Sequence, residues 1–301
     1  MKRLMMTMVV GAVFAAAAAP RPHIFPQVLP EDEPTIRANV ESWKAAPAKK
    51  PHKMLVISSD DAAEWHGEAV TYAIRALTCA CIKGGWRFDM ADYAVLADAG
   101  LLAKYDAVVM NNPTHIKVSS YPAIEQNLDS FVKGGKGIVL IHSAVDGMFD
   151  CPALQCMCAG AFWGHPWTIF GGTWGIQNEE PGHPLNAAFG GRAKIKLVDE
   201  LYQHSSPPYR RSDLRVLLSV DMSDPESAAA LERYVKRNGA DKVRSDKDFA
   251  VSWCRRWGQG RVFYTTFGHD KKAFLDPERL HHILDAVQYA LGDVTVPDNP
   301  R

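Results

Sequence analysis

The chain has 301 residues, of which 47% are hydrophobic and 23% are charged, values typical of a globular protein that can bury a large core. Its 34 basic residues balance 34 acidic ones, so the formal net charge is zero. This balance gives no electrostatic basis for binding nucleic acid or an acidic membrane surface, and it favours a small neutral ligand.

The first residues have the pattern of a cleavable export signal. A basic pair at positions 2 and 3 precedes the apolar run Leu4–Phe14, and the small residues Ala15–Ala19 follow. The apolar run is too short to cross a bilayer well, and no later run reaches the roughly 20 residues that a membrane helix needs. The sequence therefore predicts a signal peptide over 1–19 and a secreted or periplasmic protein with no membrane span.

Six cysteines follow: Cys79, Cys81, Cys151, Cys156, Cys158 and Cys254. In an oxidising compartment they allow up to three disulfides, and the alternative is buried free thiols. The spacing from 151 to 158 resembles a metal motif, but the second ligand pair of a zinc finger is absent. Disulfides or free thiols therefore explain these residues better than zinc does.

Residues 20–52 are rich in proline and charge, and we expect an extended leader with one short helix over 35–44. Apolar strands and amphipathic helices then alternate. The predicted strands cover 53–59, 87–92, 105–110 and 137–141, and the predicted helices cover 68–82, 95–104 and 122–132. This alternation predicts an α/β fold with right-handed crossovers and a parallel sheet.

The second half of the chain has a different pattern. Residues 160–190 carry many aromatic side chains and two His-Pro pairs, and 225–247 form a charged, helical insertion that we expect to be exposed. The remaining predicted elements are strands at 193–198 and 214–220, a hairpin of 249–257 with 260–267, and a closing helix over 277–291. No internal repeat or linker divides the chain, so we expect one domain over 53–292 with a tail at 293–301.

Five of the eleven histidines lie where a strand ends or beside rigid turn residues: His66, His142, His165, His183 and His269. Any one of them alone is better explained as a core histidine bonded to the backbone. His142 and His269, however, both follow apolar strands, and the carboxyl ends of parallel strands share one edge of the sheet, where ligands bind. Clustered imidazoles suit acid–base catalysis or metal binding.

Two acidic residues could assist this centre. Glu200 could act as a general base, orient a histidine or accept hydrogen bonds from sugar hydroxyls, and a plain surface acidic pair with Asp199 is the alternative. Asp270 could orient His269 or cap the helix that follows. Ser143 adjoins His142, but neighbours at a strand end point to opposite faces, so we expect no nucleophile–base pair.

Several catalytic templates are absent from the sequence. It has no G-x-G-x-x-G after the first strand and no G-x-x-x-x-G-K-[ST], so nothing indicates a dinucleotide or nucleoside triphosphate site. G-x-S-x-G and H-E-x-x-H are also missing.

Taken in order, a series of segments resembles the ThuA-like (trehalose utilization) domain over about 53–291. These segments are Gly134–Ala144 (GGKGIVLIHSA), Gly160–Phe162 with His165-Pro166, His183-Pro184, Asp199–Tyr202 (DELY) and Val251–Asp270. One departure is Ala161, where the family usually has a second glycine. The leader and the insertion at 225–247 lie outside the resemblance.

The resemblance implies a class I glutamine amidotransferase-like fold, a flavodoxin-like three-layer sandwich with a mostly parallel central sheet. His142 stands about where amidotransferases of that fold carry the nucleophilic cysteine, so no glutaminase activity is expected. The family is associated with uptake and breakdown of trehalose and related disaccharides, often beside oxidoreductases that make 3-keto sugars.

These observations lead to one hypothesis, an exported carbohydrate-processing protein, whether hydrolase, lyase or isomerase. The expected catalytic side chains are His142, His269, His66, His165, Glu200 and Asp270. The expected sugar-binding side chains are Trp65, Trp163, Trp167, Trp253, Asn112 and His183. A divalent metal on His66, His142, His165 and His269 is one option, a non-catalytic sugar-binding or interaction protein is another, and a homodimer stays open.

Overall fold

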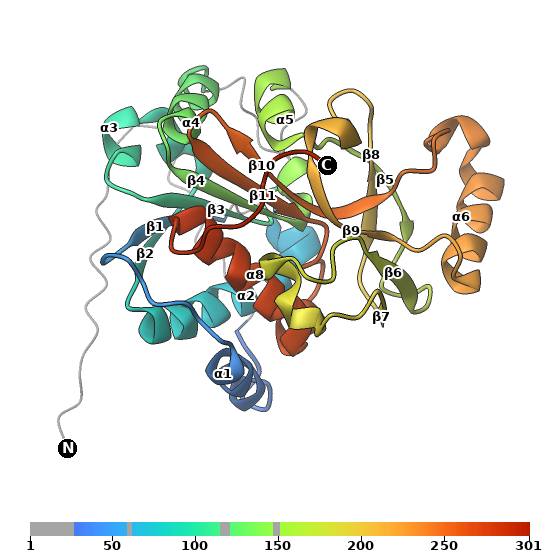
Figure 1. Ribbon diagram of the computed structural model, residues 1–301, viewed down its shortest axis with the longest axis horizontal. Coiled ribbons are helices and arrows are strands. Elements are labelled where there is room, and N and C mark those ends of the chain that lie inside the picture. The colour runs from blue at the N-terminus through green and yellow to red at the C-terminus, as the bar shows by residue number, and fades with distance from the viewer. Residues whose placement is uncertain (1–26, 59–61, 115–120, 147–150) are drawn as a thin grey trace.

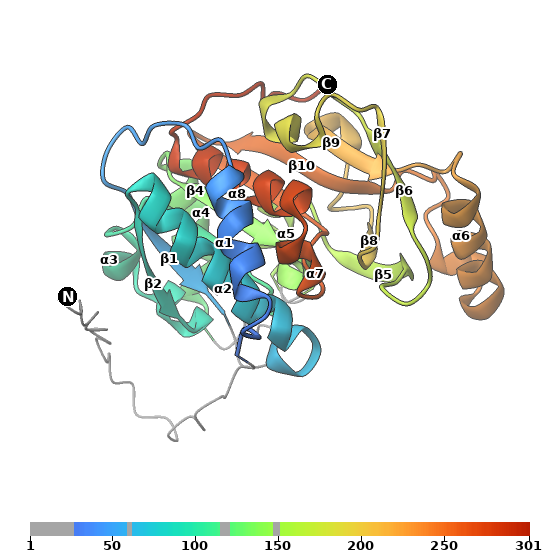
Figure 2. The ribbon, with the colours of Figure 1, turned by 90° about the horizontal axis from the view of Figure 1, so that it is seen from below.

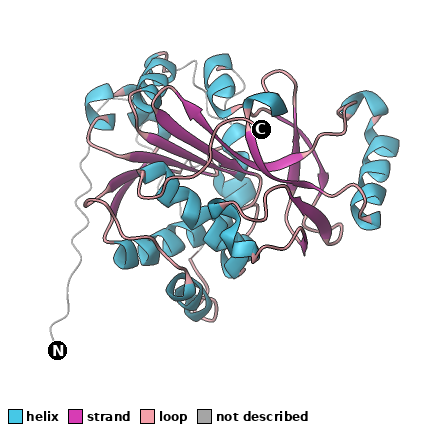
Figure 3. Ribbon diagram, in the orientation of Figure 1, coloured by secondary structure: helices cyan, strands magenta, loops and turns pink. Residues whose placement is uncertain are grey.

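The computed structural model describes residues 27–58, 62–114, 121–146 and 151–301, so the predicted export signal lies outside the described part. Nine strands form one mixed sheet (Figures 1 and 3). Their spatial order is β2 (Arg87–Ala91), β1 (Lys53–Ile57), β3 (Ala107–Asn111), β4 (Gly137–Ile141), β11 (Gly260–Thr265), β10 (Ala250–Trp257), β9 (Arg215–Val220), β6 (Trp174–Asn178) and β7 (Lys194–Leu197).

The sheet has a parallel and an antiparallel half. Neighbours from β2 through β11 run parallel, and every pairing from β11 through β7 is antiparallel. The predicted α/β class with parallel strands at its centre is confirmed. The predicted hairpin is also confirmed, because β10 and β11 pair antiparallel. Ser252 lies opposite Thr265 at one end of the pairing, and Trp257 lies opposite Gly260 at the other.

Helices cover both faces of the parallel half, which gives three layers (Figures 1 and 2). The helices on one face are α1 (Glu33–Ser42), α2 (Ala62–Gly84) and α8 (Pro277–Leu291), and those on the other include α4 (Ala123–Lys133) and α5 (Pro152–Cys158). Along β4, Val139 and Ile141 pack into the core under α1, α2 and α8, whereas Ile138 and Leu140 pack into the core under α4 and α5. This alternation explains why β4 is apolar at every position.

One glycine fixes how closely a helix approaches the sheet. A Cβ atom at Gly137 would lie 2.1 Å from the carbonyl oxygen of Ala290 in α8. Any larger residue would therefore push α8 away from the start of β4.

The leader is more integrated than the sequence predicts. α1 buries Ile36 and Val40, and Trp43 directly after it is buried as well. The Trp43 indole Nε1 donates to Oδ1 of Asp285 in α8 at 2.8 Å. The segment before residue 53 therefore packs as part of the fold.

Two other expectations need correction. The helix predicted over 95–104 is split into a 3-10 turn, η1 (Tyr93–Ala97), and a short α3 (Ala99–Leu102). The split falls at Asp98, whose side chain accepts from the backbone N–H of Leu101 and so caps the second element. In the predicted insertion, α6 (Pro225–Asn238) buries one face against β5 (Phe162–Trp167) and β6, so it is not simply exposed.

The sequence analysis identified neither β5 nor β8 (Leu201–His204), which pair as a separate antiparallel ribbon. Their register is irregular around Gly164, which has φ +133°, and Pro166 follows two residues later. Such residues interrupt the regular alternation by which strands are recognised.

Among the described residues, no disulfide bond joins the six cysteines, which agrees with the alternative to disulfides. Burial raises the pKa of Cys81 to about 12 and also raises the pKa values of Cys158 and Cys254. Protonated, enclosed thiols react slowly, so these side chains serve as packing groups. Among the described residues, no helix combines the length and apolar character of a membrane span.

Candidate active site

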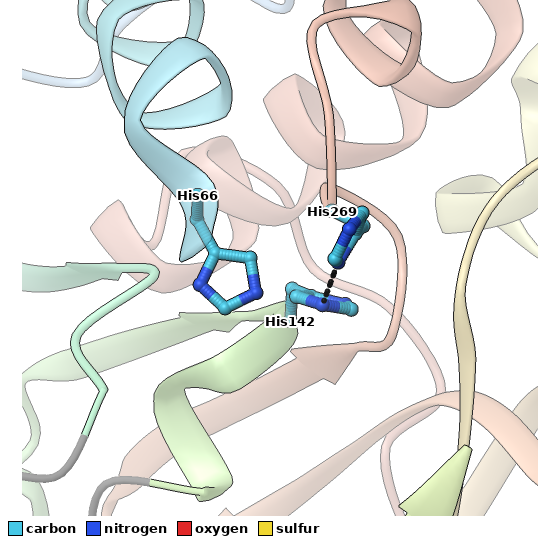
Figure 4. Close-up of side chains that lie close together, drawn as sticks. All are labelled: His66, His142 and His269. Carbon is cyan, nitrogen blue, oxygen red and sulfur yellow. Dashed lines mark hydrogen bonds between the residues drawn. The ribbon is translucent and has the colours of Figure 1, made fainter. Parts of the chain in front are cut away.

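Three histidines from distant parts of the sequence meet at the carboxyl edge of the parallel half (Figure 4). His142 follows β4, His269 follows β11, and His66 lies in α2. Their ring centroids are 4.9 to 5.2 Å apart, and one nitrogen from each ring can be chosen so that all three lie within 4.8 Å of one another. The structure thus brings together three of the four histidines expected to form the centre.

The surroundings of His142 define its tautomer. The residue has φ +49°, and its fully buried ring places Nδ1 2.6 Å from the carbonyl oxygen of Thr266. A carbonyl only accepts, so Nδ1 carries the hydrogen and Nε2 of the neutral ring presents a lone pair. Tyr202 donates its hydroxyl to this Nε2 at 2.8 Å. Burial, followed by the neighbouring His66 and His269, holds the pKa of His142 well below its usual value.

His269 is oriented by a sharp turn after β11. Gly268 has φ +116°, and a Cβ atom there would approach Ile141 to 2.8 Å, so the turn needs glycine. Nδ1 of His269 lies 3.2 Å from Nε2 of His142 and 3.3 Å from Oε1 of Glu200. Burial opposes the charged form of His269, but the Glu200 carboxylate outweighs it, and the pKa of His269 is raised.

His66 sits at a break in α2, where its backbone is non-helical (φ −130°, ψ 19°). Its Nδ1 lies 3.2 Å from the hydroxyl of Thr114 and 3.4 Å from that of Ser143. Ser143 also accepts from Thr114 at 3.0 Å. Ser143 therefore faces His66 and not its neighbour His142, as expected from strand geometry.

Glu200 connects the three-histidine cluster with His165. Its Oε1 lies 3.8 Å from Nε2 of His142, and its Oε2 lies 3.4 Å from Nδ1 of His165. The Glu200 side chain is 12% exposed, whereas that of His165 is 42% exposed and its ring stacks on Phe162. His165 thus lies on the solvent side of Glu200, outside the cluster of three.

Sequence reasoning missed the role of Asp199, which it treated as half of a surface acidic pair. The Asp199 carboxylate is buried and accepts from the backbone N–H groups of Gly268, His269 and Glu200 at 2.9 to 3.2 Å. Arg279 in α8 lies 3.3 Å away and balances its charge. Asp199 therefore holds the two loops that carry His269 and Glu200.

Tyr202 was also missed as a site residue, although the motif that contains it was noted. One residue, Leu201, separates it from Glu200, and side chains at i and i+2 of an extended chain share a face. This i, i+2 spacing in the sequence is the signal that could have identified Tyr202 as a partner of Glu200 in the site. A second phenol, Tyr264, donates to the backbone carbonyl of His142 at 3.2 Å.

Four of the expected site residues do not face this centre. Trp167 and Trp253 are fully buried and donate their indole N–H groups to the carbonyls of Ser227 and Cys158. These rings pack the core, so the expectation that they bind sugar is wrong.

The other two make local contacts. His183 is buried and bonds the carbonyl of Pro297 at 2.8 Å and the N–H of Leu185, which anchors the C-terminal tail. The Asp270 carboxylate accepts from the N–H of Lys272 at 2.7 Å, a local bond made from the position before Lys271, the N-cap of the short helix α7 (Lys272–Leu275).

The remaining expected residues are one buried amide and two exposed indoles. Asn112 is buried, and its side-chain amide bonds to the protein itself. It donates to the carbonyl of Gly268 at 3.2 Å and accepts from the hydroxyl of Ser143, so it supports the loops that follow β4 and β11. Trp65 precedes His66 and is 59% exposed, and Trp163 follows Phe162 and is 36% exposed. Both indoles are therefore accessible to a ligand.

Two kinds of chemistry fit this arrangement. Adjacent imidazoles whose pKa values are pushed apart, as in His142 and His269, are typical of acid–base pairs. Neutral imidazoles with a nearby carboxylate are also typical ligands of transition metals. The fold and centre thus define an α/β protein with a polar site at the carboxyl edge of its parallel strands.

Comparison with known proteins places the chain in a family. A family model described as ThuA, trehalose utilisation, matches residues 53–290, and the chain belongs to this family. No curated protein matches it in sequence.

Two solved structures share the fold. A ThuA-like protein from Bacteroides uniformis is 19% identical, with a TM-score of 0.58 over 83% of this chain and 95% of that one. A ThuA-like protein from Parabacteroides merdae is 17% identical, with a TM-score of 0.55 over 82% and 92%. The suspected family relationship is therefore confirmed.

Proposed function

We propose that the protein is a carbohydrate-processing enzyme that acts on a disaccharide of the trehalose class, or on its 3-keto derivative, at the cluster of His66, His142 and His269. The observation that carries this proposal is the convergence of three imidazoles and the Glu200 carboxylate at the edge of the sheet where α/β proteins bind ligands. Membership of a trehalose utilisation family supports the substrate class.

Two exposed rings, each adjacent in sequence to a side chain of the site, suit a sugar. Trp65 and Trp163 offer flat apolar surfaces that can stack on the C–H face of a pyranose, while the imidazoles and Glu200 can bond its hydroxyls. The zero net charge of the chain agrees with a neutral ligand.

Glu200 and His165 form a polar connection from the cluster toward solvent. Glu200 reaches the buried histidines with one oxygen and the half-exposed His165 with the other. This connection provides a route for a proton removed next to a carbonyl, or given to a departing glycosidic oxygen.

The test is a product screen with the purified chain. Trehalose, other disaccharides and their 3-keto derivatives are incubated with wild-type protein and with His142→Gln, and products are identified by mass spectrometry. We expect product from one substrate class with wild-type protein and none with the variant. A His281→Gln variant, altered at a histidine that bonds the carbonyl of Asn39 away from the cluster, should keep full activity.

Calorimetry with the same sugars separates catalysis from binding. Sugar binding without product would support the non-catalytic alternative and contradict an enzyme. Neither binding nor product with any disaccharide would contradict both.

The proposal includes export, based on the signal pattern at 1–19. N-terminal sequencing of protein expressed in a bacterium should find a periplasmic chain that starts within or just after the alanine run. A chain that keeps Met1 and stays in the cytoplasm would contradict export.

A further inference from the structure

The donor atoms of the centre have the spacing of a metal-ligand set. Nε2 of His142, Nδ1 of His269 and Oε1 of Glu200 form a triangle with sides of 3.2, 3.3 and 3.8 Å. Zinc bonds nitrogen and carboxylate oxygen at about 2.0–2.2 Å, and tetrahedral angles then separate two ligand atoms by about 3.3–3.5 Å. His66 joins this set, since one nitrogen from each of the three rings can be chosen so that all lie within 4.8 Å of one another.

Groups behind two of the rings support the same interpretation. The carbonyl of Thr266 accepts from Nδ1 of His142, which directs the lone pair of Nε2 toward the other donors. The hydroxyls of Thr114 and Ser143 lie against Nδ1 of His66. Ligating histidines usually have such a partner at the second ring nitrogen, because it fixes the tautomer and the ring orientation.

We propose that His66, His142, His269 and Glu200 bind one divalent transition-metal ion. Three imidazoles favour zinc, iron, cobalt or nickel, and the carboxylate also admits manganese, whereas magnesium and calcium prefer oxygen ligands alone. The ion replaces the hydrogen-bonding contacts that Nε2 of His142 makes with the Tyr202 hydroxyl and with Nδ1 of His269.

This inference rests on the proposed function, because it concerns the same centre and explains how that centre would act on a sugar. An ion with a coordination position left open can polarise a sugar carbonyl or hydroxyl. Metal binding is nevertheless measurable without turnover, so the two proposals can fail separately.

The experiment uses the full untagged chain, stripped with a chelator and then loaded with Zn²⁺, Mn²⁺ or Co²⁺ alone. We expect one ion per chain by elemental analysis and a higher melting temperature on loading. X-ray absorption of the wild-type zinc-loaded protein should count three imidazole ligands, a readout that depends on no variant. His142→Gln and His269→Gln should each lower the affinity at least about 100-fold.

Matched controls exclude other donors. Cys156→Ser removes an exposed thiol, and His165→Gln removes the histidine that lies beyond Glu200. Both should keep binding within a few-fold of wild type. Circular dichroism of each stripped variant shows whether it folds.

Each outcome decides the metal proposal. Less than stoichiometric binding for every ion, or binding that survives both histidine substitutions, would overturn it. If that result came with wild-type turnover of a sugar, the proposed function would stand without a metal. Stoichiometric binding with no activity on any sugar would uphold the metal site and overturn the function.

Discussion

The parallel half of the nine-stranded sheet and the separate ribbon of β5 and β8 contribute differently to the candidate site. The parallel half carries His142 and His269 at the edge where its strands end, and its covering helix α2 carries His66. The ribbon carries Tyr202 and His165, and Glu200 directly precedes β8; these side chains face the imidazoles. The parallel half therefore provides the nitrogens of the cluster, and the ribbon places a hydroxyl and a carboxylate against them and links them to the more exposed His165.

The largest expected effect tests whether the ribbon side of the site, through Glu200, takes part in the chemistry. Glu200→Gln keeps the size of the side chain but removes its negative charge beside His269. We expect turnover of the identified sugar to fall about 10²- to 10⁴-fold, the usual contribution of a proton-transfer group. Steady-state kinetics provides the measurement, with Glu226→Gln on the exposed face of α6 as the control. A change in KM alone would assign Glu200 to sugar binding.

The next effect concerns Asp199, which connects the loop before β8 with the loop after β11. Asp199→Ala removes the acceptor for three backbone N–H groups and leaves Arg279 without its buried partner. We expect the free energy of unfolding to fall by about 3–5 kcal/mol, as when one partner of a buried ion pair is lost. Urea denaturation measures this change. Asp270→Ala, next to His269, should cost only about 1 kcal/mol, because it removes one exposed hydrogen bond from the N–H of Lys272. Equal losses in the two variants would contradict the role assigned to Asp199.

The same comparison explains which parts of the structure the sequence predicts. A parallel strand buried on both faces is an unbroken apolar run, so the end of Gly137–Ile141 locates His142 directly. The ribbon strand β8 gives no such signal, because Gln203 is buried within it. Its amide donates to the carbonyl of Lys242 and accepts from the N–H of Arg244, and these partners lie about 40 residues away.

Side-chain direction limits the prediction of the site in a second way. Trp163 and Trp253 are both indoles in strands, yet one is partly exposed and the other is fully buried. The difference depends on which neighbour covers each strand, and for Trp253 it is the end of α5, through the carbonyl of Cys158. Composition and local spacing carry no information about that contact.

A pH-dependent effect is expected in the helices that cover the parallel half. Burial raises the pKa of Asp285 to about 7, even though the hydrogen bond from Trp43 acts in the opposite direction. Its folded-state pKa thus lies above the unfolded value, so its contribution is fully present below about pH 4 and is lost as the pH rises through about 7. Melting temperatures of wild type and Asp285→Asn should diverge over this interval, with the variant less dependent on pH. Parallel curves would show that Asp285 does not titrate there.

The smallest expected effect separates the two phenols that contact His142. Tyr202→Phe keeps the ring against Phe162 but removes the hydroxyl that lies 2.8 Å from Nε2. Tyr264→Phe removes a hydroxyl that bonds only the backbone carbonyl of His142. Each loss should cost about 0.5–1.5 kcal/mol of stability, since each removes one buried hydrogen bond. Only Tyr202→Phe should also lower kcat, by about tenfold, because its hydroxyl alone touches the nitrogen that faces the other donors. An equal change in kcat for both variants would mean that the ribbon, through Tyr202, only supports the position of His142 and does not act on its Nε2.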